Sequence, residues 1–147
     1  MLKTILVAVD SSAQHPAVLD QAAELAIASG ARVHVVSVAD AVSQGTVPMV
    51  YPSGQFIDSL NREVDGVLKA ACHRLSDQGV PCQTHALFGQ VVQQIVDLAG
   101  ELKADMVIIG HRHLSWMQRL VENSVGRNLL DQAPCNVLVV IECTGAA

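Results

Sequence analysis

Residues 105–141, DMVIIGHRHLSWMQRLVENSVGRNLLDQAPCNVLVVI, are the stretch that decides the fold. The aliphatic run Met106–Ile109 predicts a buried strand that stops at Gly110. A loop rich in His and Arg follows, and Ser124 is a candidate N-cap for a short helix. A second aliphatic run, Val137–Ile141, predicts another strand. Because unpaired N–H groups at a helix start attract negative charge, this segment predicts an anion site.

The rest of the chain repeats the alternation of strand and helix. The other predicted strands are Thr4–Val9, Arg32–Val38 and Gln83–Leu87, and apolar residues at helical spacing follow Ser11-Ser12, Phe56 and Val91. Strands separated by helices cannot pair as hairpins, so the sheet should be parallel. We therefore predict a single α/β domain over residues 1–147. It is a doubly wound five-stranded parallel sheet of order 3-2-1-4-5 with helices on both faces.

Composition excludes several classes of protein. Half of the 147 residues are hydrophobic and 3% are aromatic, which suits strands buried on both faces. The net charge of −5 argues against generic nucleic-acid binding, and no apolar run approaches the length of a membrane span. The four cysteines form no CxxC pair and no zinc spacing. These features predict a cytoplasmic protein with reduced thiols.

Asp10 and Gly110 should face the same crevice. In the order 3-2-1-4-5 the winding reverses between the first and fourth strands, and ligands bind at the carboxyl ends of strands at such a point. Asp10 ends the first strand and Gly110 ends the fourth. Asp10 is either a simple cap for the following helix or a carboxylate that contacts a ribose hydroxyl, a base amino group or a metal.

No constellation of catalytic residues emerges from the sequence. His111 and His113 lack an obvious third metal ligand, so we predict no metal site there. The GxSxG, GxxxxGK[ST] and GxGxxG motifs are absent. A dedicated enzyme is therefore disfavoured. The long connection 39–54 is either a lid over a ligand or a surface excursion.

The chain resembles the universal stress protein family over essentially its whole length. The resemblance is carried by ILVAVDSS near the start, the turn at Gly89, ADMVIIG, and SVGRNLLDQAPCNVLVV near the end. It implies a fold like that of the adenine nucleotide alpha hydrolases, usually as a dimer. Many members of the family bind ATP at the switch-point crevice.

The family's phosphate pattern is Gly, two residues, Gly, nine residues, Gly, then Ser or Thr. Laid on this sequence it matches Gly110, His113, Asn123 and Ser124, so two of the three glycines are replaced. By resemblance Gly110, Asn123, Ser124 and Val125 would hold or flank phosphates. Asn tolerates the left-handed region better than most residues. His113 adds a side chain where ATP-binding members leave room.

The same resemblance assigns the base pocket and the ligand. Asp10 would contact adenine or ribose, and Val38 and Ile109 would line the pocket for the base. The candidate ligands are ATP or AMP, with Mg²⁺ as a candidate companion of ATP. We predict a stress-response adenine-nucleotide-binding module with weakened binding, and at most slow ATP hydrolysis.

An interaction protein without a ligand is the alternative. The last strand should lie at an edge of the sheet, and a long aliphatic edge invites pairing with another chain. We predict a homodimer through this strand, and the resemblance points the same way.

Overall fold

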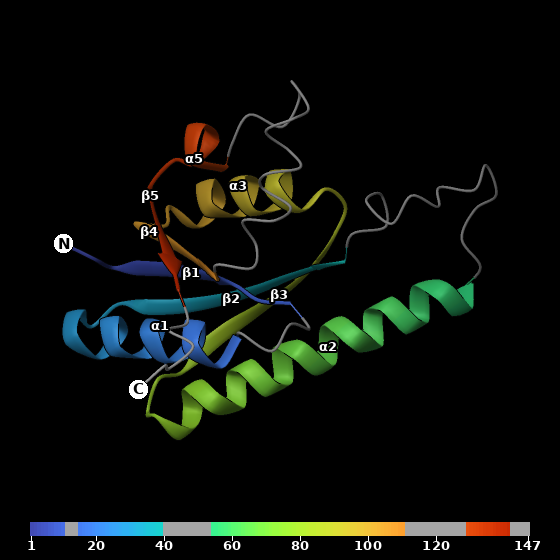
Figure 1. The fold of residues 1–147 in the computed structure, drawn as a ribbon, viewed down its shortest axis with the longest axis horizontal. Helices are drawn as coiled ribbons and strands as arrows, with labels where there is room; N and C mark the ends of the chain where they lie inside the picture. The colour runs from blue at the N-terminus through green and yellow to red at the C-terminus, as the bar shows by residue number, and fades with distance from the viewer. Residues whose placement is uncertain (11–14, 40–53, 111–128, 142–147) are drawn as a thin grey trace.

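The computed structural model of the protein describes residues 1–10, 15–39, 54–110 and 129–141. Within these ranges strands and helices alternate along the chain (Figure 1). The strands are β1 (Thr4–Ala8), β2 (Arg32–Ala39), β3 (Cys82–Phe88), β4 (Met106–Gly110) and β5 (Asn136–Val140). The helices are α1 (His15–Ser29), α2 (Gly54–Asp77), α3 (Val91–Leu102) and α5 (Leu129–Gln132).

The strands form one parallel sheet of order β3-β2-β1-β4-β5. This confirms the predicted doubly wound fold and its order. The strands occupy their predicted places to within one or two residues. The last of them, for example, spans Asn136–Val140 instead of Val137–Ile141. The predicted helix start at Ser124 lies outside the described residues, which resume at Leu129 with α5.

Helices cover both faces of the sheet, α1 and α2 on one side and α3 and α5 on the other (Figure 1). Alternate residues of each strand feed the two cores. Ile5 and Val7 of β1 pack with α1 and α2, whereas Leu6 and Ala8 pack with α3 and α5. All but one of the side chains from Ile5 to Ala8 are wholly inaccessible. The aliphatic composition of the central strands therefore follows from their burial on both sides.

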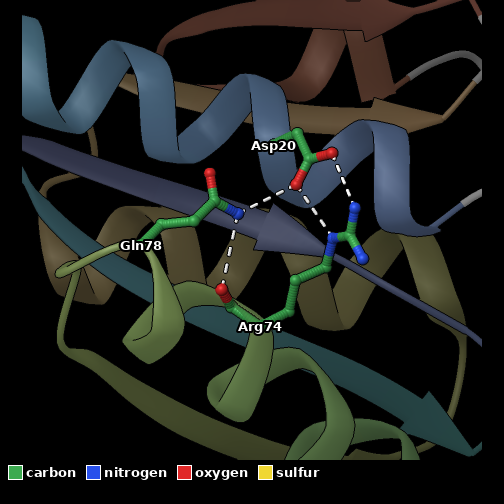
Figure 2. A network of polar contacts seen from close by, with 3 residues as sticks. All are labelled: Asp20, Arg74 and Gln78. Atoms are coloured by element: carbon green, nitrogen blue, oxygen red, sulfur yellow. Dashed lines mark hydrogen bonds and ion pairs between the residues drawn. The ribbon is translucent and has the colours of Figure 1, made fainter.

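Helix α2 is held to the sheet by one apolar stripe and to α1 by a polar cluster. Val64, Leu68, Ala71 and Leu75 recur at helical spacing and are all buried. The guanidinium of Arg74 donates two hydrogen bonds of 2.8 Å to the carboxylate of Asp20 on α1. Figure 2 shows Gln78 beside them; its side-chain amide donates to the same carboxylate at 2.9 Å.

The amino ends of the strands are joined to the helices by short turns. After α3, Lys103 adopts a left-handed conformation (φ 52°) and its N–H donates to the carbonyl of Gly100. Asp105 follows two residues later, and its carboxylate accepts the N–H groups of Lys3 and Thr4 at 2.8 and 2.9 Å. These two hydrogen bonds hold the pKa of Asp105 below its usual value. The start of β1 is thereby fixed to the start of β4.

Candidate functional site

The carboxyl ends of β2, β1 and β4 lie side by side and form part of the carboxyl end of the sheet. Strand β1 stands between the other two, with Val7 opposite both Val35 of β2 and Ile108 of β4. The crossover from β1 leads to β2 on one side, whereas the crossover from β3 returns to β4 on the other. This is the reversal of winding at which α/β sheets bind ligands.

Asp10 lies just beyond the carboxyl end of β1, at this reversal. The N–H of Val9 donates to the carbonyl of Val36 at 2.9 Å, so β1 keeps its partner for one residue beyond its formal end. Asp10 follows and is half-buried. Two residues beyond Ile108 the neighbouring strand ends at Gly110, which is buried and pairs with Val140 of β5. Asp10 and Gly110 therefore lie at the same, carboxyl end of the sheet, and the crevice between them remains a prediction.

Val38 and Ile109, near the carboxyl ends of β2 and β4, belong to the apolar cluster between the sheet and α3. Both pack on the side covered by α3, in the cluster that includes Ala8 and Val36. Ile109 is completely buried, and Val38 is half-buried at the rim of the cluster. Of the two, only Val38 has side-chain surface that a ligand could contact. Ile109 is enclosed within the same apolar cluster.

The end of β2 is also tied to the turn that enters α3. The N–H of Gly89 donates to the carbonyl of Ala39 at 3.1 Å. Gly89 has φ 137°, a conformation that side chains of L-residues rarely adopt. A Cβ there would also lie 3.2 Å from the side chain of Gln94. The backbone conformation and the close approach of Gln94 explain why a Gly precedes α3. The hydrogen bond to Ala39 fixes this turn to the carboxyl end of β2.

Apart from Gly110, the phosphate-binding part of the prediction lies outside the described residues. His113, Asn123, Ser124 and Val125 all fall in the range 111–128, as does His111. The described residues therefore place Asp10, Val38 and Ile109, assigned to the base and ribose, at one end of the sheet together with Gly110, the first residue of the phosphate pattern. The assignment of phosphate contacts remains a prediction.

A pair of histidines escaped the sequence analysis. His34 of β2 is almost fully buried, and its Nδ1 lies 2.9 Å from Nε2 of His85 on β3, with the two rings stacked. Burial lowers the pKa of His34, and electrostatic interactions with His85 and Arg32 lower it further. His34 is thus a sheet residue whose ring has a hydrogen-bond partner. Its partner could be found only from the register of β2 and β3.

Metal ligands and membrane spans were searched within the described ranges. No group of three or more His, Cys, Asp or Glu side chains there is arranged to hold a metal ion. In those ranges every helix is too short or too polar to traverse a bilayer. A hollow of about 510 Å³ does occur, but it lies at the opposite end of the sheet, near Arg32 and Cys82.

Comparison with known proteins gives a consistent family. The model of the universal stress protein family matches residues 1–140. Universal stress protein A homolog 1 of Coxiella burnetii is 31% identical over 144 residues, covering 94% of this chain and 95% of that protein. A universal stress protein family structure from Burkholderia pseudomallei is 28% identical with a TM-score of 0.73, covering 95% and 96% of the two chains.

One further solved structure carries a ligand. The universal stress protein from Archaeoglobus fulgidus in complex with dAMP is 26% identical to this chain, with a TM-score of 0.68. The alignment covers 95% of this chain and 98% of the other. The similarity spans the described strands and helices as a whole.

Proposed function

The chain belongs to the universal stress protein family, and from this membership we propose that it is a stress-response module that binds adenine nucleotides weakly. The observation that carries the proposal is the convergence of Asp10, Val38 and Gly110 at the reversal of the sheet. A carboxylate at that point accepts hydrogen bonds from a ribose or an adenine amino group. The half-buried Val38 offers apolar surface to the base.

The bound relative supports the class of ligand. The Archaeoglobus fulgidus protein holds dAMP, an adenine nucleotide with one phosphate. An adenine nucleotide with few phosphates also suits this chain. Asp10 and Val38, assigned to the ribose and base, lie at the reversal of the sheet, whereas two of the three glycines in the family's phosphate pattern are replaced. We propose ATP or AMP as the ligand, with Mg²⁺ accompanying ATP.

Two substitutions in the glycine pattern should weaken the phosphate contacts. Asn123 and His113 stand where nucleotide-binding members of the family carry Gly. Each backbone N–H to a phosphate is worth about 1.5–3 kcal/mol, so loss of one or two contacts costs roughly 10- to 10³-fold or more in affinity. A protonated His113 would return part of this by adding positive charge.

Calorimetry with ATP and AMP tests the proposal, each with and without Mg²⁺. The double variant His113→Gly/Asn123→Gly restores the family pattern and should bind ATP at least about 10-fold more tightly than the natural chain. His111→Gly removes a neighbouring imidazole outside the pattern and serves as the matched control, with affinity unchanged. Absence of heat at millimolar nucleotide for the natural chain and the double variant alike would end the proposal.

A second candidate function rests on the edge strand β5. Its residues Val137–Val140 are only half-buried, and Ile141 beyond them is 64% exposed. An aliphatic edge with free backbone groups pairs readily with another copy of itself. We propose a homodimer through β5, either together with nucleotide binding or in its place.

Sedimentation tests this interface. Ile141→Lys places a charge on the edge and should convert a dimer into a monomer at micromolar concentration. Ile27→Lys is the matched control, because Ile27 on α1 is 65% exposed and lines the hollow beside the amino ends of β2 and β3. A natural chain that sediments only as a monomer would refute the interface.

Slow ATP hydrolysis is the weakest of the proposals. It needs a base near the γ-phosphate, and the candidate site residues supply only the carboxylate of Asp10 and the imidazole of His113. Turnover that Asp10→Ala abolishes, while ATP stays bound at saturating concentration, would favour an enzyme. We propose no catalytic residue.

A further inference from the structure

Two cysteine sulfurs meet where α2 ends and β3 begins. Sγ of Cys72 lies 2.8 Å from Sγ of Cys82, with the Cys82 thiol as the donor. Both cysteines are unbridged here, and both are half-buried. A disulfide has an S–S length of about 2.05 Å, so a small inward movement separates this contact from a bond.

The turn between the two residues is fixed by its backbone. The N–H groups of Gly79 and Val80 donate to the carbonyls of Ser76 and Leu75, both at 2.9 Å. Gly79 has φ 77°, which favours glycine, and the side chains of Leu75 and Val80 are buried. The two sulfurs are therefore held together by the local fold.

The polar cluster on α1 supports the same helix end. Arg74 and Gln78 flank this last part of α2, and both donate hydrogen bonds to Asp20 (Figure 2). The cluster keeps the end of α2 against α1. Cys72 consequently has a fixed position from which to reach Cys82.

Small molecules can reach the Cys82 side of the pair. Cys82 and its neighbours Pro81 and Gln83 line the hollow of about 510 Å³ at the amino end of the sheet. This volume admits a hydroperoxide or a small thiol reductant. The pair also belongs to the edge formed by β3, which is the edge remote from β5. A dimer through β5 would leave it accessible.

The two sulfurs have distinct chemical roles. Burial, followed by the hydrogen bond to the Cys72 sulfur, raises the pKa of Cys82 to about 12. Cys82 thus remains a thiol at neutral pH and donates its proton toward Cys72. Because the Cys82 thiol donates its proton toward the Cys72 sulfur, we assign the attack on an oxidant to Cys72 and the resolving step to Cys82.

We propose that Cys72 and Cys82 form a reversible redox site that a hydroperoxide converts into an intramolecular disulfide. The Cys72 sulfur attacks the peroxide oxygen, giving a sulfenic acid and releasing an alcohol, or water when the peroxide is H₂O₂. The Cys82 sulfur then attacks the sulfenic sulfur; the S–S bond forms, the S–O bond breaks, and the hydroxyl leaves as water with the proton of the Cys82 thiol. Two thiols lose two electrons and two protons, and the peroxide is reduced. The bond joins α2 covalently to the edge strand β3.

Peptide mapping of the full chain tests the site. Trypsin cuts after Lys69, Arg74 and Lys103, so the two cysteines separate into the peptides 70–74 and 75–103. After hydrogen peroxide treatment and alkylation of the remaining thiols, these peptides should appear linked and lighter by two hydrogens. Two of the four thiols should resist alkylation, and dithiothreitol should restore them.

Variants at the same and other cysteines provide controls. Cys72→Ser and, independently, Cys82→Ser should each abolish the linked peptide, whereas Cys135→Ser should retain it. Circular dichroism establishes that each variant is folded, and the natural chain alone already decides whether the link forms. Oxidation of Cys72 to sulfinic acid without a link, links to Cys135 or Cys143, or four alkylated thiols after peroxide would each overturn the proposal.

Discussion

The two ends of the sheet are built from the same strands but differ in how the chain leaves them. At the amino end the helices return to the strands through short turns, such as Gly30-Ala31 before β2 and Lys103–Asp105 before β4. At the carboxyl end Gly89 and Gln90 alone separate β3 from α3, but long stretches of sequence separate the described elements after β2 (residues 40–53) and after β4 (residues 111–128). One end therefore joins elements compactly, and the other carries the residues assigned to a ligand.

This difference separates stability from binding. The carboxylate of Asp105 ties the first and fourth strands together at the amino end. Asp10, another aspartate near a strand terminus, lies at the carboxyl end, where the winding reverses. Changes at the amino end should therefore act on unfolding, and changes at the carboxyl end should act on nucleotide affinity.

The largest effect is expected from the core at the amino end. Leu75 is completely buried, and its carbonyl accepts the N–H groups of Gln78 and Val80 in the turn to β3. Leu75→Ala should lower the free energy of unfolding by about 2–5 kcal/mol, because it leaves a cavity. Urea unfolding measures this. The affinity of the folded variant for AMP should stay unchanged, and a parallel loss of affinity would contradict the separation.

Asp10→Ala should produce the opposite profile. Loss of a charged hydrogen-bond acceptor costs about 1.5–3 kcal/mol, so AMP affinity should fall about 10- to 100-fold by calorimetry. Asp105→Ala is the control at the other end, and it should destabilise the fold while leaving the affinity of the folded protein intact. Equal losses of affinity in the two variants would contradict a site at the carboxyl end.

A pH-dependent stability should arise from the buried histidine pair. The pKa of His34 is lowered in the fold from an ordinary value of 6.5, chiefly by burial. Above pH 6.5 both states hold the ring neutral; below it the unfolded chain takes up a proton first, so stability falls as pH falls. The slope should not exceed about 1.4 kcal/mol per pH unit.

Chemical denaturation between pH 7 and 5 measures this slope. His34→Gln keeps a hydrogen-bonding side chain that does not titrate in this range, so its slope should be smaller. The control is His73→Gln, because the side chain of His73 is 81% exposed. Identical slopes in the natural chain and in His34→Gln would rule out the pair as the source.

The smallest effect belongs to the polar cluster between α1 and α2. Arg74→Met removes an ion pair whose partners are nearly half exposed, so unfolding should become easier by only about 0.2–1 kcal/mol. The hydrogen bond from Arg74 lowers the pKa of Asp20 below 3.8, so this contribution is present above that pH and disappears in stronger acid.

Thermal unfolding at pH 7 and in strong acid compares the cluster with a control on the same helix. Arg62→Met is suitable, because the Arg62 side chain bonds the carbonyl of Asp58 within α2. A larger loss in Arg62→Met than in Arg74→Met would show that the cluster contributes nothing specific.

The sequence predicted the sheet because burial on both faces leaves a local record. Each central strand is an uninterrupted aliphatic run, and the alternation with helices then restricts the order of the strands. Asp10 and Gly110 could be assigned to the same end of the sheet for the same reason. They directly follow or close such runs, and all parallel strands end on the same side.

Contacts between side chains of different elements leave no comparable pattern in the sequence. The pairing of His34 with His85 depends on the register of β2 and β3, and the bond from Asp105 to Lys3 joins residues far apart in the chain. The contact of Cys72 with Cys82 follows from the geometry of one turn. The sequence showed these residues individually but carried no periodicity that links them. His113, Asn123, Ser124 and Val125 remain predictions from the family pattern.

The most direct test of the central claim is an NMR titration of the isotope-labelled chain with AMP. Binding at the reversal of the sheet should shift the amide signals of Val9, Asp10, Val38 and Gly110. It should leave those of Gly30, Gly79 and Asp105 at the amino end in place. Shifts confined to the amino end, or no shifts at millimolar AMP, would contradict the account.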